Sequence, residues 1–340
     1  MGDDESMKKK RRLPLIFLVF LFLFVTLTVT VWALRSNLSP KRGEEPFSVL
    51  VCGLDESRLN TDVMFVACAE PTAARMTVLQ IPRDTLILNG EGKSVKINSR
   101  FAAFRASGMS GREAAIALKK EISSTLGLNI SQVIIPTSEA VASLVDLLGG
   151  IKVDVPKDIT YSDPAEEEFS LKAGEQVLNC RQALAFLRYR SGYARGDLAR
   201  MDAQKLFLSG VVSRLREGVS LSFAAKAAKI LSGQAIYTDM NLVRGIESGY
   251  RMMEQSHGKL YLCTLPGEAL YTDASWYYVA RRAGAEALFA ERLSAFYAEA
   301  GFDAQKRLCN PQNLGVLNAY SAPDRTYRIY AEEELSKLSF

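Results

Sequence analysis

The sequence predicts an α/β fold with a central, mainly buried sheet and helices on both faces. Apolar runs of strand length, such as Phe47–Leu54 and Met76–Ile81, show no polar alternation, which is typical of strands covered on both faces. Segments of helical periodicity, such as Gly111–Leu126 and Leu198–Leu215, alternate with these runs. Alternating strands and helices are the pattern of a sheet between helical layers.

One transmembrane helix is predicted ahead of this domain. Leu13–Leu34 carries no charge and, as a helix, would span roughly 33 Å, enough to cross a bilayer. The basic run Lys8–Arg12 before it predicts a cytoplasmic amino terminus and an extracellular remainder. Val31–Ala33 resembles a signal-peptidase site, so a cleaved signal peptide is the alternative. The predicted organisation is a basic end (1–12), an anchor (13–34), a linker (35–46), an extracellular domain (47–297) and an extension of unassigned role (298–340).

Composition excludes several functional classes. The net charge of +4 and the lack of a nucleic-acid motif predict no nucleic-acid partner. The 5 cysteines lie singly, without a CxxC pair, which argues against zinc clusters and a disulfide scaffold. Cys52 and Cys68 are predicted to be buried free thiols, with a disulfide between them as the alternative. With His257 as the single histidine, any chemistry must depend on Asp, Glu, Arg and Lys.

Three carboxylates are predicted at strand ends. Asp55 follows the first apolar run, Asp62 precedes the second run (Val63–Ala67), and Asp84 follows the third. Ligands of open α/β sheets bind at such edges, and carboxylates are ligands that Mg²⁺ prefers. The alternative is that each Asp only caps a turn. Arg83 beside Asp84 favours a ligand site.

An arginine-rich stretch lies between two predicted helices. Cys180–Leu187 is an amphipathic helix stopped by Ser191 and Gly192, and Arg188 and Arg190 follow its last apolar turn. Guanidinium groups offer a planar fork of donors and stay charged, so they suit an anion with several oxygens. A solvated basic helix is the alternative.

The second of these helices starts with a polar face. Asp197 is expected as its N-cap, and Arg200 and Gln204 follow on the same face. The arginine stretch therefore predicts an anion site shared by two helix ends.

Further elements follow the same periodicity rules. The sequence predicts strands at Gln132–Pro136, Ile151–Val155 and Lys259–Leu265, and helices at Glu139–Leu148, Ser222–Leu231, Asn241–Glu254 and Trp276–Ala298.

Together these motifs resemble the LytR–CpsA–Psr family of bacterial cell-wall phosphotransferases. The matching pieces are VCGLD (51–55), TDVMF (61–65), IPRDT (81–85), KIN (96–98), LVDLLGGIKV (144–153), AGEQVLNCRQALAFLRYR (173–190) and the Asp197–Gln204 segment. They occur in the family's order and cover roughly residues 47 to 297.

The resemblance implies transfer of an anionic glycopolymer, such as teichoic acid or capsule, from undecaprenyl pyrophosphate to peptidoglycan with the help of Mg²⁺. It also implies that the polyprenyl lipid lies in an apolar groove. Carried over by position, Asp55 and Asp62 are implied metal ligands, and Arg83, Arg188, Arg190 and Arg200 are implied pyrophosphate contacts. Asp84, Asp197 and Gln204 are implied to hold the arginines or complete the site, with Arg83, Asp84 and Asp197 as catalytic candidates.

Two positions depart from the family pattern. An arginine is common two residues before the second metal-binding Asp, where this chain has Asn60, and another just before Gln204, where it has Ala203. Arg58 is a candidate substitute for the first. Because each charged hydrogen bond contributes about 1.5–3 kcal/mol, these changes favour the first of two further hypotheses, while the second keeps the site and makes water the acceptor. The first is a membrane-bound protein that holds polyprenyl lipids without turnover, and the second is a lipid pyrophosphatase.

Overall fold

The structure is a computed structural model that describes residues 45–55, 58–136, 138–161, 169–190, 192–217, 226, 237–240, 258–272, 275–297, 328–338 and 340. The predicted transmembrane segment and most of the helices predicted at 222–231 and 241–254 lie outside these residues. Within the described ranges, no helix has the length and apolar character needed to cross a membrane.

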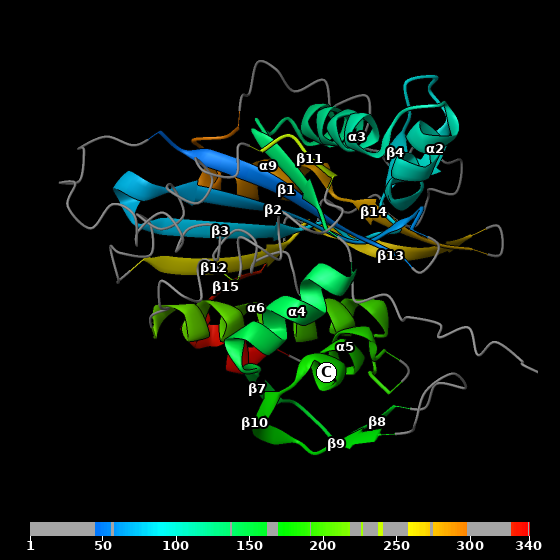
Figure 1. Ribbon diagram of the computed structural model, residues 1–340. Helices are drawn as coiled ribbons and strands as arrows, with labels where there is room; N and C mark the ends of the chain where they lie inside the picture. Colours follow the sequence, from blue (N-terminus) through cyan, green and yellow to red (C-terminus); the bar gives the residue numbers. More distant parts are fainter. Residues whose placement is uncertain are drawn as a thin grey trace, which may run out of the picture.

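A seven-stranded mixed sheet forms the centre of the molecule (Figure 1), with the strand order β11-β6-β1-β2-β3-β12-β15. The three central strands form an antiparallel meander, and β6 and β12 run parallel to the outer strands of that meander. The strands are β1 (Phe47–Leu54), β2 (Thr61–Glu70), β3 (Arg75–Gln80), β6 (Gln132–Ile135), β11 (Tyr237–Thr238), β12 (Lys259–Thr264) and β15 (Ile329–Ala331).

Helices cover both faces of this sheet, as predicted (Figure 1). On one face lie α2 (Arg100–Ala106), α3 (Gly111–Leu126) and α9 (Arg282–Arg292). On the other lie α4 (Ser138–Leu148), α5 (Cys180–Arg188) and α6 (Asp197–Arg216). Short 3-10 helices are η1 (Pro71–Ala73), η2 (Ile97–Ser99) and η5 (Glu332–Lys337).

Four two-stranded sheets surround the main sheet. They pair β4 (Leu86–Leu88) with β5 (Ser94–Lys96), β7 (Ile151–Val155) with β10 (Gly174–Leu178), β8 (Ile159–Tyr161) with β9 (Phe169–Leu171), and β13 (Gly267–Thr272) with β14 (Ser275–Ala280).

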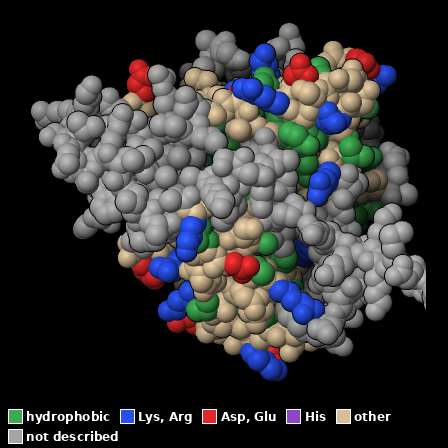
Figure 2. Space-filling model, in the orientation of Figure 1, with side chains coloured by type: hydrophobic (Ala, Val, Ile, Leu, Met, Phe, Trp, Pro, Cys, Tyr) green, Lys and Arg blue, Asp and Glu red, His purple; other side chains and the backbone are tan. Residues whose placement is uncertain are grey.

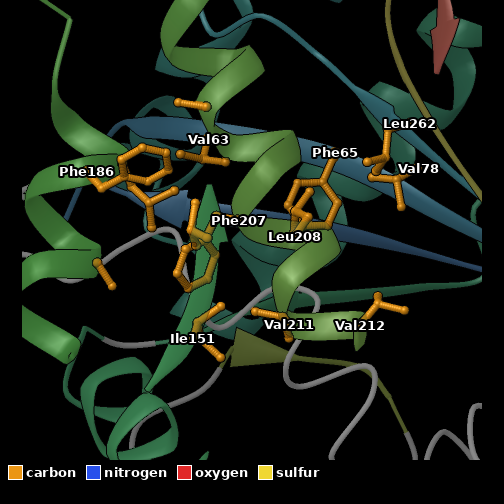
Figure 3. Close-up of a cluster of buried hydrophobic side chains, with 14 of the residues drawn as sticks. Val63, Phe65, Val78, Ile151, Phe186, Phe207, Leu208, Val211, Val212 and Leu262 are labelled. Atoms are coloured by element: carbon orange, nitrogen blue, oxygen red, sulfur yellow. The ribbon is translucent and has the colours of Figure 1, made fainter. Parts of the chain in front are cut away.

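Apolar layers lie on both faces of the central strands, because alternate residues of β1 and β2 point to opposite sides. On the side of α5 and α6, Phe65 of β2 belongs to the same buried apolar cluster as Phe186 of α5 and Phe207 of α6 (Figure 3). On the other side, Leu50 and Cys52 pack with residues of α3 and α9. The prediction of strands covered on both faces is therefore confirmed.

Helix α6 approaches the β7–β10 pair closely at Gly210. A Cβ atom there would lie 2.2 Å from the carbonyl oxygen of Lys152 in β7. No side chain fits at that separation, so the glycine lets α6 lie against this strand.

The helix predicted at Trp276–Ala298 is wrong at both ends, since its first part is a strand and α9 ends at Arg292. Ser275–Ala280 forms strand β14, and the helix α9 begins only at Arg282. The aromatic run at 276–278 has high strand propensity, and pairing with β13 satisfies its backbone groups. The helical spacing that starts at Tyr277 is therefore coincidental.

Part of the predicted carboxyl-terminal extension completes the main sheet. Strand β15 pairs with the edge of β12, and η5 packs against α6. Glu332 forms an ion pair with Arg216 of α6 and accepts a hydrogen bond from Ser209. The ring of Phe340 lies 5.5 Å from that of Tyr193.

Candidate functional site

The three predicted carboxylates lie at one edge of the sheet. Because β1 and β3 run antiparallel to β2, the end of β1, the start of β2 and the end of β3 meet there. Gly53 pairs with Val63 and Leu54 with Thr61, so Asp62 is the extra residue of a β-bulge. A bulge turns a side chain away from the regular alternation, and here it presents Asp62 to Arg83.

The Asp55 carboxylate caps the turn between β1 and β2. Its Oδ1 accepts the backbone N–H groups of Leu59 and Asn60, at 3.1 and 3.2 Å. Its Oδ2 accepts the side-chain amide of Asn60 at 2.8 Å. The alternative that Asp55 caps a turn is therefore confirmed, while its metal-binding role stays a prediction.

An outer charge cluster, defined as Asp62, Arg83, Asp84, Lys96, Asp197 and Arg200, surrounds this edge. Arg83 Nη1 donates to Asp62 Oδ1 at 2.8 Å, and its Nε lies 3.6 Å from Asp84 Oδ2. Asp84 Oδ1 in turn lies 3.0 Å from Lys96 Nζ. The side chains of four members are 22–32% exposed, so solvent reaches them: Asp62, Arg83, Asp84 and Lys96.

The first turn of α6 contributes the rest of the outer charge cluster. Arg200 Nη2 lies 2.7 Å from Asp197 Oδ1. Burial by itself would lower the pKa of Arg83, but the negative charges of Asp197 and Asp62 overcome this and raise it. Arg83 is therefore held as a cation between acids from two distant segments.

Asp197 is not the N-cap of α6, contrary to the prediction. Gly196 occupies that position with a φ of 53°, and Asp197 is the first helical residue. An acid in the first turn still favours the positive end of the helix dipole, and here its carboxylate pairs with Arg200.

A glutamine that the sequence analysis missed ties α6 to the sheet. Gln80, at the end of β3, is only 1% exposed. Its Nε2 donates to the carbonyl of Met201 at 3.1 Å and lies 3.4 Å from Gln204 Oε1. A polar residue inside the apolar run MTVLQI was the signal that could have identified it. Lys96 was also missed, although it lies within the KIN motif.

The remaining predicted arginines, Arg188 and Arg190, lie at the end of α5 and just beyond it, where the chain leads to α6. Arg188 is the last residue of α5, while Arg190 lies beyond the helix and is exposed. Among the described residues, neither has an acidic partner. Lys157 Nζ donates to the carbonyl of Gly192 at 2.6 Å and so holds the loop in place.

Several donors of the predicted site have no acceptor within the described chain. Arg83 Nε, Arg188 Nη2, Arg200 Nε and Gln204 Nε2 are buried atoms that make no hydrogen bond to any described residue. A buried donor without a partner costs about 1–3 kcal/mol, so four of them among the predicted anion contacts need a reason. An anionic ligand with several oxygens would satisfy them.

A second group of charges, the inner charge cluster, is defined as Arg195, Asp202 and Lys205. Lys205 Nζ lies 2.5 Å from Asp202 Oδ1, and both side chains are less than 10% exposed. Arg195 pairs with the other oxygen of Asp202, and Lys205 Nζ lies 5.7 Å from the ring of Tyr330 in β15. Burial lowers the pKa of Lys205, and the charge of Asp202 offsets part of this effect.

The two departures from the family pattern have different consequences here. Asn60 supplies a neutral amide to Asp55 where a cation is common. Ala203 is fully buried and belongs to the apolar layer between the sheet and α5–α6.

The donor set of the predicted metal site fits Mg²⁺ by its chemistry. Both predicted ligands are carboxylates, and Arg83 engages only one oxygen of Asp62. Mg²⁺ commonly takes one or two protein carboxylates and completes its shell with substrate phosphates and water. A larger cluster of three or more acidic, His or Cys ligands does not occur among the described residues.

Basic side chains on the face in Figure 2 are spread over both the sheet layer and the helical layer and do not form one continuous patch. The candidate site is therefore distinguished by its local geometry, in which acids and buried donors meet. Cys52 and Cys68 are both free and buried, as predicted.

Known proteins show the same fold. TagV of Bacillus subtilis, by its crystal structure, matches 76% of this chain and 100% of that chain, with a TM-score of 0.60 and 23% identity. The structure of TagT bound to LIIa-WTA matches 76% of this chain and 94% of that chain, with a TM-score of 0.58 and 19% identity.

Sequence comparison leads to the same group. The polyisoprenyl-teichoic acid–peptidoglycan teichoic acid transferase TagV of Bacillus subtilis is 26% identical over 253 residues, which are 70% of this chain and 62% of that protein. The transferase of the same description named TagU, from Oceanobacillus iheyensis, is 25% identical over 242 residues, or 69% of this chain and 72% of that protein. The chain thus spans less than two thirds of the length of TagV.

The family match runs from residue 29 to residue 292. It covers six of the seven strands of the main sheet, all but β15, together with both helical layers, Asp62 and the arginines that follow α5. With most of its length included in that match, this chain belongs to the LytR_cpsA_psr family.

Proposed function

We propose that this chain is a membrane-anchored transferase that moves an anionic glycopolymer from a polyprenyl-pyrophosphate carrier to peptidoglycan. The observation that carries the proposal is the set of buried donors on Arg83, Arg188, Arg200 and Gln204 that lack acceptors in the described chain. A pyrophosphate offers enough oxygens to accept from all of them. Relatives described as teichoic acid transferases support the same substrate class.

Each part of the site has a role in this proposal. Arg83 and Arg200 neutralise the pyrophosphate oxygens, and Asp62 and Asp197 hold these two guanidinium groups in position. Arg190, which is exposed, contacts the donor from the solvent side. Phosphoryl transfer depends mainly on positioning and charge stabilisation, so the absence of histidine from the described residues of the site is no obstacle.

In the reaction, a sugar hydroxyl of peptidoglycan attacks the phosphorus joined to the glycan, and polyprenyl phosphate leaves. Asp84 is the candidate base for that hydroxyl, since its carboxylate lies beside Arg83 and Lys96 at the edge of the site. Asp197 is the alternative base. Asp55 and Asp62 would hold Mg²⁺, which when bound would supply further positive charge next to the phosphate oxygens.

The apolar layer between the sheet and α5–α6 is the proposed neighbour of the lipid chain. Val63 and Phe186 belong to this layer (Figure 3), and in the sequence they lie next to Asp62 and two residues before Arg188. The predicted anchor at 13–34 would hold the domain near the membrane in which the lipid carrier lies.

The test uses the full-length protein in detergent with a lipid-linked oligosaccharide donor and purified sacculi. We expect sugar to become covalently bound to the sacculi, and chelation of Mg²⁺ to stop this. Asp62→Ala should abolish transfer, whereas Glu91→Ala, a change in an exposed ion pair with Lys93, should not. Retained transfer by Asp62→Ala would remove the metal hypothesis.

The two other hypotheses are outcomes of the same assay. Release of glycan phosphate together with polyprenyl phosphate, without sugar on the sacculi, would identify a lipid pyrophosphatase. Co-purification of polyprenyl lipid, detected by mass spectrometry, without any consumption of the donor would identify a lipid-binding protein.

A further inference from the structure

The β13–β14 hairpin exposes a pair of aromatic side chains. Tyr271 and Trp276 lie directly opposite each other across the two strands, and their ring centroids are 5.1 Å apart. Tyr271 is 57% exposed and Trp276 is 59% exposed. Single exposed apolar residues are ordinary, but two adjoining exposed rings form a patch that suggests a binding partner.

This hairpin is bonded directly to the acidic loop of the candidate site. The backbone N–H of Tyr278 donates to the carbonyl of Asp84 at 2.8 Å, and Thr85 forms a β-bridge with Tyr278. Lys96, which pairs with Asp84, also lies 5.0 Å from the ring centroid of Tyr277. Trp276 is two residues from Tyr278, roughly 7 Å along the strand.

The base of the hairpin is rigid. Tyr278 is buried, and its hydroxyl donates to the carbonyl of Leu265 at 2.5 Å. Glu268 of β13 forms an ion pair of 2.5 Å with Arg281, the residue that follows β14. Together with the hydrogen bond from Tyr278 to Asp84, these contacts place the hairpin beside the candidate site. Figure 1 shows β13 and β14 at the same end of the sheet as β4, which follows Asp84 in the chain.

Charge indicates what kind of molecule these rings bind. From Gly267 to Arg281 the sequence has two acids, Glu268 and Asp273, and one arginine. A slightly acidic hairpin is a poor surface for an anionic bilayer or for the anionic donor polymer, which the arginines of the site would attract instead. A neutral sugar remains well suited, because the C–H face of a pyranose stacks on an aromatic ring while its hydroxyls stay in water.

We propose that Tyr271 and Trp276 form a platform for the acceptor, a glycan strand of N-acetylated hexoses. This proposal rests on the proposed transferase function and deepens it, since it assigns the acceptor side of the site. The rings hold neighbouring sugars of the strand, and the rigid connection through Tyr278 delivers one hydroxyl to the edge at Asp84. Pyrophosphate and sugar are thus recognised by different chemistry, arginines for the one and aromatic rings for the other.

The chain offers a direct optical test. It contains 2 tryptophans, so Trp32→Phe leaves Trp276 as the single tryptophan. In full-length protein in detergent, we expect a saturable change in Trp276 emission when a soluble tetramer of N-acetylglucosamine is added. No change at any concentration would overturn the proposal.

Sedimentation with purified sacculi measures the same contact on the polymer. We expect Tyr271→Ala combined with Trp276→Ala to weaken binding at least about tenfold, the scale of losing aromatic stacking. Val177→Ala, which removes an exposed apolar side chain on β10, should bind as the unchanged protein does. Equal binding by the double variant would contradict the platform.

The membrane alternative has its own measurement. In nanodiscs that contain brominated lipids, quenching of Trp276 would show that the rings lie in the bilayer and would overturn the proposal. The expected result is no quenching.

Failure of the platform and failure of the transferase function give different results. If the unchanged protein transfers polymer and the double variant does so equally at limiting sacculi, only the platform is wrong. If the unchanged protein binds glycan through Trp276 but never consumes a lipid-linked donor, the platform stands and the transferase function is wrong. The variants should bind the polyprenyl-pyrophosphate donor as the unchanged protein does, since the rings make no part of the arginine site.

Discussion

Two groups of ion pairs lie on different sides of the first half of α6. The outer charge cluster faces the end of β3, where Asp62 and Arg83 remain 32% and 22% exposed. The inner charge cluster faces β15, and its Asp202 and Lys205 are 8% and 3% exposed. Asp197 and Arg200 of the outer charge cluster lie close in sequence to Arg195, Asp202 and Lys205 of the inner charge cluster, yet the surroundings of the two clusters separate their roles.

The difference lies in which charges are already compensated. Asp202 is shared by Lys205 and Arg195, so the buried carboxylate has two cations. In the outer charge cluster, Arg83 and Arg200 have acidic partners but keep buried Nε donors without acceptors in the described chain. The inner cluster is therefore expected to support the fold, and the outer cluster to bind an anion.

The largest expected effect is on stability, from Asp202→Ala. Removing one partner of a buried ion pair leaves an uncompensated charge, here on Lys205, and costs about 3–5 kcal/mol. Chemical denaturation of the full-length protein should measure this loss. Glu175→Ala breaks the exposed pair with Lys152 and should leave the unfolding midpoint unchanged. If Asp202→Ala unfolds at the same midpoint as the Glu175 control, the inner cluster has no structural role.

Arg200→Met should reduce transfer and leave the unfolding midpoint nearly unchanged, the opposite of Asp202→Ala. The substitution keeps an apolar stem in a buried position but removes the donors, so transfer should fall roughly 100-fold, as expected for one or two charged hydrogen bonds. Initial rates of transfer to sacculi and the unfolding midpoint should both be measured. A variant that loses stability but retains its rate per folded molecule would show that Arg200 belongs with the structural group.

Salt should distinguish the clusters without any substitution. Raising KCl from about 0.1 M to about 1 M shortens the screening length from roughly 10 Å to roughly 3 Å. Solvent-accessible contacts to the donor should weaken several-fold, while the buried inner pair is little affected. We therefore expect the KM for the donor to rise and the unfolding midpoint to be almost constant. A midpoint that falls in parallel with donor affinity would contradict the separation.

The smallest expected effect is from Arg190→Ala. This side chain is exposed and has no acidic partner among the described residues, so its contact with a donor would be solvated. We expect a rise in KM of about threefold to tenfold, in line with a solvated charge pair, and little change in kcat. Arg181→Ala, an exposed arginine at the other end of α5, is the matched control. Equal effects of the two variants would mean that Arg190 adds only general positive charge.

Local pattern predicted much of the fold. The runs that became β1 and β6 and the periodic segment that became α3 were predicted to within a residue or two. Such elements depend on hydrophobic periodicity and on stop signals that are adjacent in the chain. The prediction for β14 failed because a short aromatic segment is compatible with both helix and strand, and its pairing with β13 decided between them.

The sequence by itself determined the fold class, the family and the kinds of residues in the site. Aspartates at strand ends and arginines at helix ends can be recognised from the residues next to them in the sequence. Tertiary structure alone decided which charge each of them meets. Gln80 and Gln204 are far apart in sequence, as are Arg83 and Asp197, and they meet only because α6 lies across the end of β3. Burial and pairing are properties of such contacts between distant segments, so no local pattern could have distinguished Asp197 from Asp202.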